Sequence, residues 1–174
     1  VGVTLFRGKQ ADVEALMKQA DLAMYKSKAA GRNTVRFFDP TMEATVKERA
    51  ALEDDLRQAI EKKQFQLHYQ AQVLGDGRLT GAEVLVRWQH PQRGMVSPAE
   101  FIPMAEDTGL ILPLGRWVLH TACTQLAVWA IHPEMAHLTV AVNVSAHPFR
   151  QADFVEQVLN VIKDTGANPQ RIKL

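Results

Sequence analysis

The order of strand and helix signals over the C-terminal two-thirds of the chain restricts its fold more than any other feature. Two segments with strand-like alternation, residues 66–74 and 79–89, flank a short Gly-Asp-Gly turn. The segments that follow are helices at 98–107 and 112–130, a strand at 138–144, a helix at 149–165 and a strand from Arg171. A tight turn makes the first two strands antiparallel, whereas strands separated by helices pair in parallel. We therefore predict an α/β domain with a mostly parallel sheet.

The first third of the chain has the same alternation on a smaller scale. The predicted elements are a strand at residues 1–6, a helix at 11–30 that ends at Gly31, and a strand at 34–38. Asp39 followed by Pro40 is a helix-start signal, because Asp accepts backbone N–H groups and Pro has a fixed φ that suits the first turn. The charged, glycine-free segment 41–63 therefore predicts a connecting helix, with a candidate break near Ala50.

Polar residues share one face of each of three predicted strands. Period two places three sets on common faces: Gln66, His68 and Gln70; Glu83, Leu85 and Arg87; and Thr139, Ala141, Asn143 and Ser145. A (β/α) barrel has its functional site at the carboxyl ends of its strands. Glu83 and Asn143 offer the oxygen ligands that Mg²⁺ or Mn²⁺ prefers, and Arg87 can bind a phosphate through two hydrogen bonds.

The same residues also have a purely structural interpretation. Glu83 and Arg87 would form a buried ion pair, and Gln70 and Asn143 would satisfy backbone groups in the core. The pattern alone leaves both interpretations open.

Composition excludes several classes of function. The 20 basic and 19 acidic side chains give a net charge of +1, so no strong field attracts a nucleic-acid polymer or a membrane surface. No apolar run approaches the roughly 20 residues that cross a bilayer, so we expect this segment to be cytoplasmic. Any membrane anchor of the parent protein would lie upstream of it. Cys123, the only cysteine, is expected to be buried on a helix. The six histidines lack metal-ligand spacing and are expected at surface or packing positions, and the three tryptophans in the core.

Three runs of sequence carry a family resemblance. They are FQLHYQAQV from Phe65, GAEVLVRWQHPQRGMVSPAEFIPMAEDTGLI from Gly81 and VAVNVSAHPFRQADFV from Val140. In order, spacing and flanks they resemble EAL-domain phosphodiesterases, and the resemblance covers residues 52–174. It implies the N-terminal half of an eight-stranded, TIM-like barrel whose first strand is antiparallel. It also implies hydrolysis of cyclic-di-GMP to pGpG with divalent metal ions.

The resemblance also implies roles for single residues. By motif position the metal ligands are Glu83 and Asn143, and the substrate contacts are Gln70, Leu85 and Arg87, the last through a phosphate. Val84 stands where the name-giving Glu-Ala-Leu motif has Ala, and because it points away from the site we expect a change in packing only. Family members continue beyond Leu174 into a segment with further acidic ligands and a lysine. We therefore expect the 174-residue chain alone to be inactive as a phosphodiesterase.

The first forty residues resemble the end of a GGDEF diguanylate cyclase domain, through VGVTLF and ADLAMYKSKAAGRNTVRFFDP. The implied organisation is a GGDEF remnant at 1–40, a linker helix at 41–51 and the EAL part at 52–174. Lys28 and Arg32, expected on one helix face, match positions that contact GTP phosphates in that family. Cations at a helix C-terminus also suit the helix dipole, which is an alternative explanation. No cyclase activity is inferred, because the name-giving loop is absent from the sequence.

Three functions follow from these observations. The first is a part of a cyclic-di-GMP phosphodiesterase in bacterial second-messenger signalling. The second is a non-catalytic cyclic-di-GMP receptor, since the presence of Glu83, Gln70 and Arg87 argues for binding and leaves catalysis open. The third is a signal-relay element built on the helix at 41–63, whose apolar stripe comprises Leu52, Leu56, Ala59 and Ile60. An open half-barrel would also expose a strand edge, which favours a homodimer.

Overall fold

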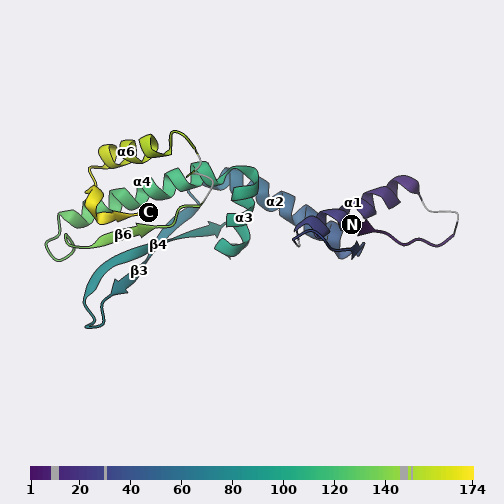
Figure 1. Cartoon of the computed structure of the whole chain (residues 1–174), viewed down its shortest axis with the longest axis horizontal. Helices are drawn as coiled ribbons and strands as arrows, with labels where there is room; N and C mark the ends of the chain where they lie inside the picture. Colours follow the sequence, from purple (N-terminus) through teal and green to yellow (C-terminus); the bar gives the residue numbers. More distant parts are fainter. Residues whose placement is uncertain (9–11, 30, 146–148, 150) are drawn as a thin grey trace. The chain divides into compact units, whose positions relative to one another are not determined.

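The computed structural model describes residues 1–8, 12–29, 31–145, 149 and 151–174. The chain forms two compact units, Val1–Asp54 and Asp55–Leu174. The division falls within helix α2 (Thr41–Glu61), close to the predicted start of the second domain at residue 52. Figure 1 shows the elements of each unit.

The first unit contains a two-stranded parallel sheet and a helix. β1 (Gly2–Val3) pairs with β2 (Arg36–Phe37), and α1 (Val13–Ala29) connects them. Both strands are shorter than the predicted segments 1–6 and 34–38. α1 lies so close to β1 that a Cβ atom on Gly2 would collide with the backbone of Ala20 and Met24. A glycine is therefore required at this contact.

Helix α2 begins as the Asp39-Pro40 signal predicted. The backbone N–H and the hydroxyl of Thr41 donate hydrogen bonds to Asp39 Oδ1 at 2.8 and 2.6 Å. These bonds, the hydroxyl bond most of all, hold the pKa of the Asp39 carboxyl below its ordinary value. The helix then continues without a break to Glu61, so the candidate break near Ala50 is wrong. Ala is the strongest helix former, and neither Gly nor Pro occurs between Thr41 and Glu61.

The second unit is built on a five-stranded sheet. Its strands are β3 (Phe65–Val73), β4 (Leu79–His90), β5 (Gly94–Val96), β6 (Thr139–Val142) and β7 (Ile172–Lys173). The order is β3-β4-β6-β7, and β5 pairs with β4 off this path. β4 is antiparallel to β3 and β5 and parallel to β6, and β6 is parallel to β7. The predicted antiparallel first strand is confirmed. The sheet is not mostly parallel as predicted, because two of its four strand pairs are antiparallel. One of these involves β5, which was not predicted because it is too short to reveal an alternation.

Helices α3 (Pro98–Thr108) and α4 (Ile111–Ala130) contact the sheet, and α6 (Phe154–Thr165) contacts α4. α6 begins five residues later than predicted, and residues 146–148 and 150 lie outside the described residues. The buried core includes Val84, Trp88, Val140 and Val142 from the sheet and Phe101, Leu114, Cys123 and Leu126 from the helices. Helices therefore cover the apolar side of the sheet, which is the side opposite to the predicted polar face.

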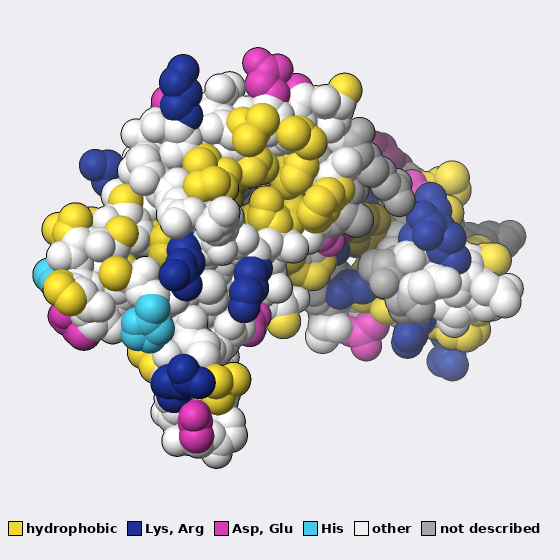
Figure 2. Space-filling view, turned by 60° about the vertical axis from the view of Figure 1, so that its left-hand side comes forward, with side chains coloured by type: hydrophobic (Ala, Val, Ile, Leu, Met, Phe, Trp, Pro, Cys, Tyr) yellow, Lys and Arg dark blue, Asp and Glu magenta, His cyan; other side chains and the backbone are white. Residues whose placement is uncertain are grey.

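Part of the apolar surface of this unit is exposed. Val155 and Leu159 on α6 are 65% and 60% exposed, and Phe149 is 56% exposed. Figure 2 shows hydrophobic side chains gathered on the upper part of the unit, where α6 lies. Within the described ranges, no helix combines the length and the hydrophobicity that crossing a membrane requires.

Candidate functional site

One face of the sheet carries the polar residues that the sequence placed together. On β4, Glu83, Leu85 and Arg87 are partly exposed and alternate with buried Val84 and Trp88. On β3, the exposed residues Gln66, His68 and Gln70 alternate with the less exposed residues Phe65, Leu67 and Tyr69. The predicted alternation on these two strands is confirmed. The helices cover the apolar face and leave the polar one open to a ligand.

The strand register aligns polar residues across the sheet. Gln70 lies opposite Glu83 in the β3–β4 pair, and Glu83 lies opposite Ala141 in the β4–β6 pair. Ala141 in turn lies opposite Lys173 in the β6–β7 pair. One row therefore crosses four strands and adds Lys173, which sequence reasoning did not single out. Extending the period-two count into the last strand would have found this cation.

Glu83 and Asn143 meet although 60 residues separate them. Asn143 Nδ2 donates a hydrogen bond to Glu83 Oε1 at 2.7 Å. Asn143 comes directly after β6, which ends at Val142 and not at residue 144 as predicted, so it lies at the carboxyl end of that strand. The bond leaves Glu83 Oε2 and Asn143 Oδ1 as two oxygen donors on adjacent side chains. Such hard donors suit Mg²⁺ or Mn²⁺, so the pair fits as one part of a metal site.

The rest of a metal site is not found in the described part of the chain. No group of three or more His, Cys, Asp or Glu residues is arranged there to hold a metal ion. Ser145, which the sequence placed on the same face as Asn143, has a buried hydroxyl oxygen with no hydrogen-bond partner among the described residues. The oxygen donors that the site does provide are therefore those of Glu83 and Asn143.

Arg87 is not paired with Glu83. Its Nη1 donates a hydrogen bond to the backbone oxygen of Val86 at 3.0 Å, and the recorded side-chain bond of Glu83 is the one from Asn143. Neither side chain is buried. Within the described residues the interpretation as a buried ion pair is therefore wrong. A guanidinium has five N–H donors, so Arg87 retains donors for a ligand.

A cavity of about 290 Å³ lies beside Arg87. Leu85, Arg87 and Asn143 line it, together with Val84 and Val86 from the other face of β4 and apolar residues of α3 and α4, so the cavity borders both faces of the strand. Apolar walls with a few convergent polar groups are typical of small-molecule sites. Three of the five predicted site residues therefore border one cavity, and Gln70 and Glu83 lie next to it in the strand register.

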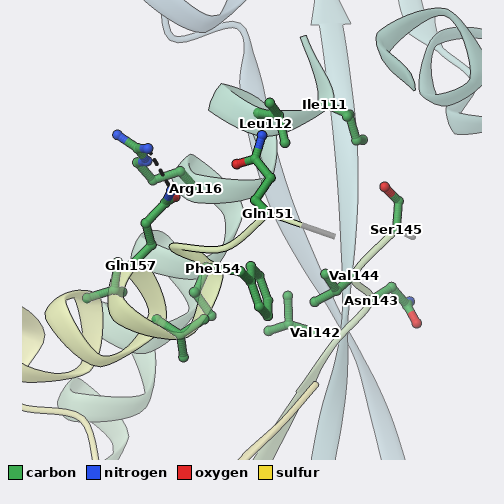
Figure 3. A pocket seen from close by; sticks show the side chains of 14 residues that line it. Ile111, Leu112, Arg116, Val142, Asn143, Val144, Ser145, Gln151, Phe154 and Gln157 are labelled. Carbon is green, nitrogen blue, oxygen red and sulfur yellow. Dashed lines mark hydrogen bonds between the residues drawn. The ribbon is translucent and has the colours of Figure 1, made fainter. Parts of the chain in front are cut away.

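A second cavity, of about 70 Å³, lies between α4 and α6. Figure 3 shows Phe154 pointing into this space and Asn143 pointing away from it. At its edge Arg116 Nη2 donates a hydrogen bond to Gln157 Oε1 at 3.0 Å. Its walls are mainly apolar. Asn143 and Ser145 line both cavities, so the second cavity adjoins the one beside Arg87.

Cys123 is a core residue, as expected. It is 1% exposed on α4, and burial raises the pKa of its thiol to about 11, although a hydrogen bond with Thr165 opposes the shift. Burial likewise raises the pKa of the Tyr69 hydroxyl. Both groups therefore stay protonated near neutral pH.

The predicted helix-face pair in the first unit is wrong. α1 ends at Ala29, and Arg32 lies beyond it with a left-handed backbone (φ 62°). Lys28 occupies the last helical turn, and both side chains are exposed. Gly31, also at positive φ, terminates the helix between them. The two cations are therefore close in sequence but do not share a face.

Sequence reasoning missed one ionisable pair near the polar face. His90, at the end of β4, is 3% exposed, and its Nε2 lies 3.1 Å from Asp55 Oδ2 on α2. The histidine was expected to be a surface or packing residue, and it is buried with a charged partner. No local pattern connects residues 35 positions apart, so the sequence holds no signal for this contact. His147 lies outside the described residues.

Comparison with known proteins identifies relatives over the whole chain. The family model described as EAL domain matches residues 53–174. The bifunctional diguanylate cyclase/cyclic di-GMP phosphodiesterase MucR of Pseudomonas aeruginosa is 42% identical over 175 residues, covering 100% of this chain and 25% of MucR. The cyclic di-GMP phosphodiesterase PdeR of Escherichia coli is 38% identical over 164 residues, covering 94% of this chain and 24% of PdeR. The chain thus spans about a quarter of the length of these relatives.

A solved structure agrees with this result. The P. aeruginosa MucR phosphodiesterase in complex with c-di-GMP superimposes with a TM-score of 0.68 at 43% sequence identity. The match covers 70% of this chain and 49% of that one. The mixed α/β fold of this chain therefore matches about half of that solved chain.

Proposed function

The chain belongs to the EAL domain family, and on this premise we propose that its polar sheet face is part of a cyclic-di-GMP site. Arg87 binds a phosphate of the dinucleotide, and Gln70 and Leu85 make further contacts to it. Glu83 and Asn143 hold Mg²⁺ or Mn²⁺. The observation that carries the proposal is the 2.7 Å bond from Asn143 to Glu83, which brings two oxygen donors together on the sheet face that also carries Arg87.

The proposed reaction of the parent protein is hydrolysis of one phosphodiester bond, which converts cyclic-di-GMP to pGpG. When bound, the divalent ion supplies Lewis-acid activation of the attacking water. Arg87 binds the phosphate oxygens through paired N–H donors and offsets their charge. The hydrogen bond between Glu83 and Asn143 restricts both side chains, so their oxygens are oriented before a ligand arrives. The names of MucR and PdeR as phosphodiesterases support this reaction.

For the 174-residue polypeptide itself we propose binding without hydrolysis. Glu83 and Asn143 provide two protein ligands, and the described residues contain no larger cluster of metal-binding side chains. Two ligands do not fix a metal ion tightly enough to activate water efficiently. The cavity beside Arg87 is formed without any further metal-binding side chains. It therefore favours a cyclic-di-GMP receptor as the second candidate function.

Calorimetric titration of the chain with cyclic-di-GMP tests the proposal. We expect micromolar binding in the presence of Mg²⁺ and binding about tenfold weaker with EDTA, because the metal ion offsets phosphate charge. Glu83→Gln keeps the size of the side chain and its hydrogen-bond acceptor but removes the charge. In this variant we expect the same weak binding with or without Mg²⁺.

The controls separate the parts of the proposal. GMP, which has the same base and a phosphate monoester, should bind much more weakly, because it fills half of the site. Absence of cyclic-di-GMP binding under both conditions would refute the site. Chromatography of the samples after incubation with Mn²⁺ should detect no pGpG, and its formation would instead identify the chain as an active hydrolase.

We further propose that residues 1–40 belong to a GGDEF domain and that residues 41–51 link it to the EAL part. Alignment of MucR, named a bifunctional diguanylate cyclase/phosphodiesterase, over the whole chain supports this organisation. Lys28 and Arg32 are then the candidate GTP-phosphate contacts, one in the last turn of α1 and one after it. A site for an intracellular second messenger also supports a cytoplasmic location.

We also propose that the polypeptide forms homodimers at high concentration. β7 lies at an edge of the sheet, and α6 exposes Val155 and Leu159. Light scattering should give a mass that rises from 19.4 kDa towards twice that value with concentration. Leu159→Lys should keep the chain monomeric. Asn160→Lys, on the same helix, should still form dimers. A constant mass of 19.4 kDa would contradict the proposal.

A further inference from the structure

His90 occupies an unusual position for a histidine. It ends β4, three residues beyond Arg87, and is 3% exposed. Its Nδ1 accepts hydrogen bonds from the backbone N–H groups of Gln92 and Arg93, both at 3.1 Å. These two donors belong to the turn between β4 and β5. The ring therefore organises the turn from inside the protein.

This geometry determines where the proton of the ring lies. Nδ1 can accept two N–H groups only if it carries no proton itself, so the neutral ring has its proton on Nε2. Nε2 lies 3.1 Å from Asp55 Oδ2. The Nε2–H group therefore donates to the Asp55 carboxylate, and both ring nitrogens are used at once.

Asp55 lies on α2, and the end of that helix is attached to β4 at other points as well. Leu56 and Ala59 are fully buried. After the helix, the backbone oxygen of Gln64 accepts from Gln89 N at 2.9 Å, and Gln64 Oε1 accepts from Trp88 Nε1 at 3.1 Å. Every residue of β4 that follows Arg87 is therefore bonded to α2 or to the segment that continues it.

We propose that Asp55 and His90, together called the α2–β4 clamp, set the position of Arg87 and make cyclic-di-GMP binding dependent on the position of α2. The proposal rests on the proposed function of the polar face. Arg87 shares its strand with His90, and the next residue, Trp88, packs edge-to-face on the His90 ring with the centroids 5.4 Å apart. α2 is continuous from Thr41 in the first unit, so a shift of the helix carries Asp55 with it.

The clamp makes Asp55 and His90 positioning residues, because neither lies on the polar face that contacts the ligand. Asp55 is on a helix, and His90 is buried. The hydrogen bond between the two residues also shows which substitution of Asp55 is conservative. In Asp55→Asn the amide oxygen still accepts from Nε2–H, whereas Asp55→Ala leaves that donor without its partner.

The test uses the 174-residue chain with cyclic-di-GMP and Mg²⁺ as the probe. We expect Asp55→Ala to weaken binding about tenfold, within the range of coupled sites, and Asp55→Asn to stay within about twofold of wild type. Cys123→Ala, a small change in the core away from the polar face, serves as the matched control and should also stay within about twofold. Rescue by Asn would distinguish positioning from a general loss of stability.

Nuclear magnetic resonance supplies a readout that does not depend on the ligand. Spectra of the imidazole nitrogens should identify the Nε2–H tautomer in wild type and Asp55→Asn. The Arg87 Nε–Hε signal should move in Asp55→Ala and not in Cys123→Ala. If the wild-type chain fails to bind cyclic-di-GMP, the proposed function is refuted. The shift of the Arg87 signal in Asp55→Ala then tests by itself whether the clamp positions Arg87. An unmoved Arg87 signal, or equal binding by Asp55→Ala and wild type, would overturn the clamp.

Discussion

Arg87→Ala is expected to weaken cyclic-di-GMP binding by about 100-fold, because two charge-assisted hydrogen bonds to a phosphate are lost together. Arg87 has donors available for such bonds, since it makes one recorded hydrogen bond to a backbone oxygen and no ion pair to Glu83 among the described residues. It also lines the cavity of about 290 Å³ with Leu85 and Asn143. Calorimetric titration in the presence of Mg²⁺ measures the change directly.

Two further variants show whether charge or geometry is lost. Arg87→Lys keeps the charge but replaces the planar fork with a point charge, so an intermediate loss of about tenfold is expected. Arg78→Ala removes the same side chain from the β3–β4 turn, where Arg78 pairs with Asp76 at 3.7 Å. That control should bind as wild type does. Unchanged binding by Arg87→Ala would rule out the proposed phosphate contact.

The prediction of the polar face from sequence succeeded because strand alternation is a local property. Glu83, Leu85 and Arg87 had to share a face once residues 79–89 formed a strand. The contact of Glu83 with Asn143 depends on the register of β4 and β6, in which Glu83 lies opposite Ala141, and the sequence pattern does not state this register. Pattern could not decide between an ion pair and a site, because that depends on side-chain rotamers. The structure excludes the ion pair, since no bond joins Arg87 to Glu83 among the described residues, and the binding site stays a prediction.

What the sequence failed to predict depends on tertiary contacts or on very short segments. β5 has three residues and forms because β4 offers it a partner at Trp88, Gln89 and His90. The contact of His90 with Asp55 joins a strand to a helix with no periodicity that relates them. In the first unit, Arg32 left the predicted helix face because Gly31 ends the helix before it. Local propensity restricts which segments can form helices or strands, but it does not predict which distant residues come into contact.

Trp88→Ala is expected to have the largest effect on stability. The side chain is fully buried, and its ring lies 5.7 Å from those of Phe65 and Phe101. Its removal leaves a cavity between the sheet and α3 and should cost about 3–5 kcal/mol. Domains of this size have about 5–15 kcal/mol of stability in total, so the second unit of the variant would be close to unfolding.

Urea unfolding followed by circular dichroism measures this loss, and the lost hydrogen bond can be separated from the lost volume. Trp88→Phe keeps an aromatic ring but removes the donor to Gln64 Oε1, so a loss of about 1–2 kcal/mol is expected. Trp129→Ala deletes the same type of side chain from a half-buried position against Tyr69, and a smaller loss than for Trp88→Ala is expected. Because His90 packs on Trp88, Trp88→Ala should also disturb the imidazole signals of His90, which Trp129→Ala should leave unchanged. Equal midpoints for Trp88→Ala and wild type would mean that this ring is not the anchor of β4.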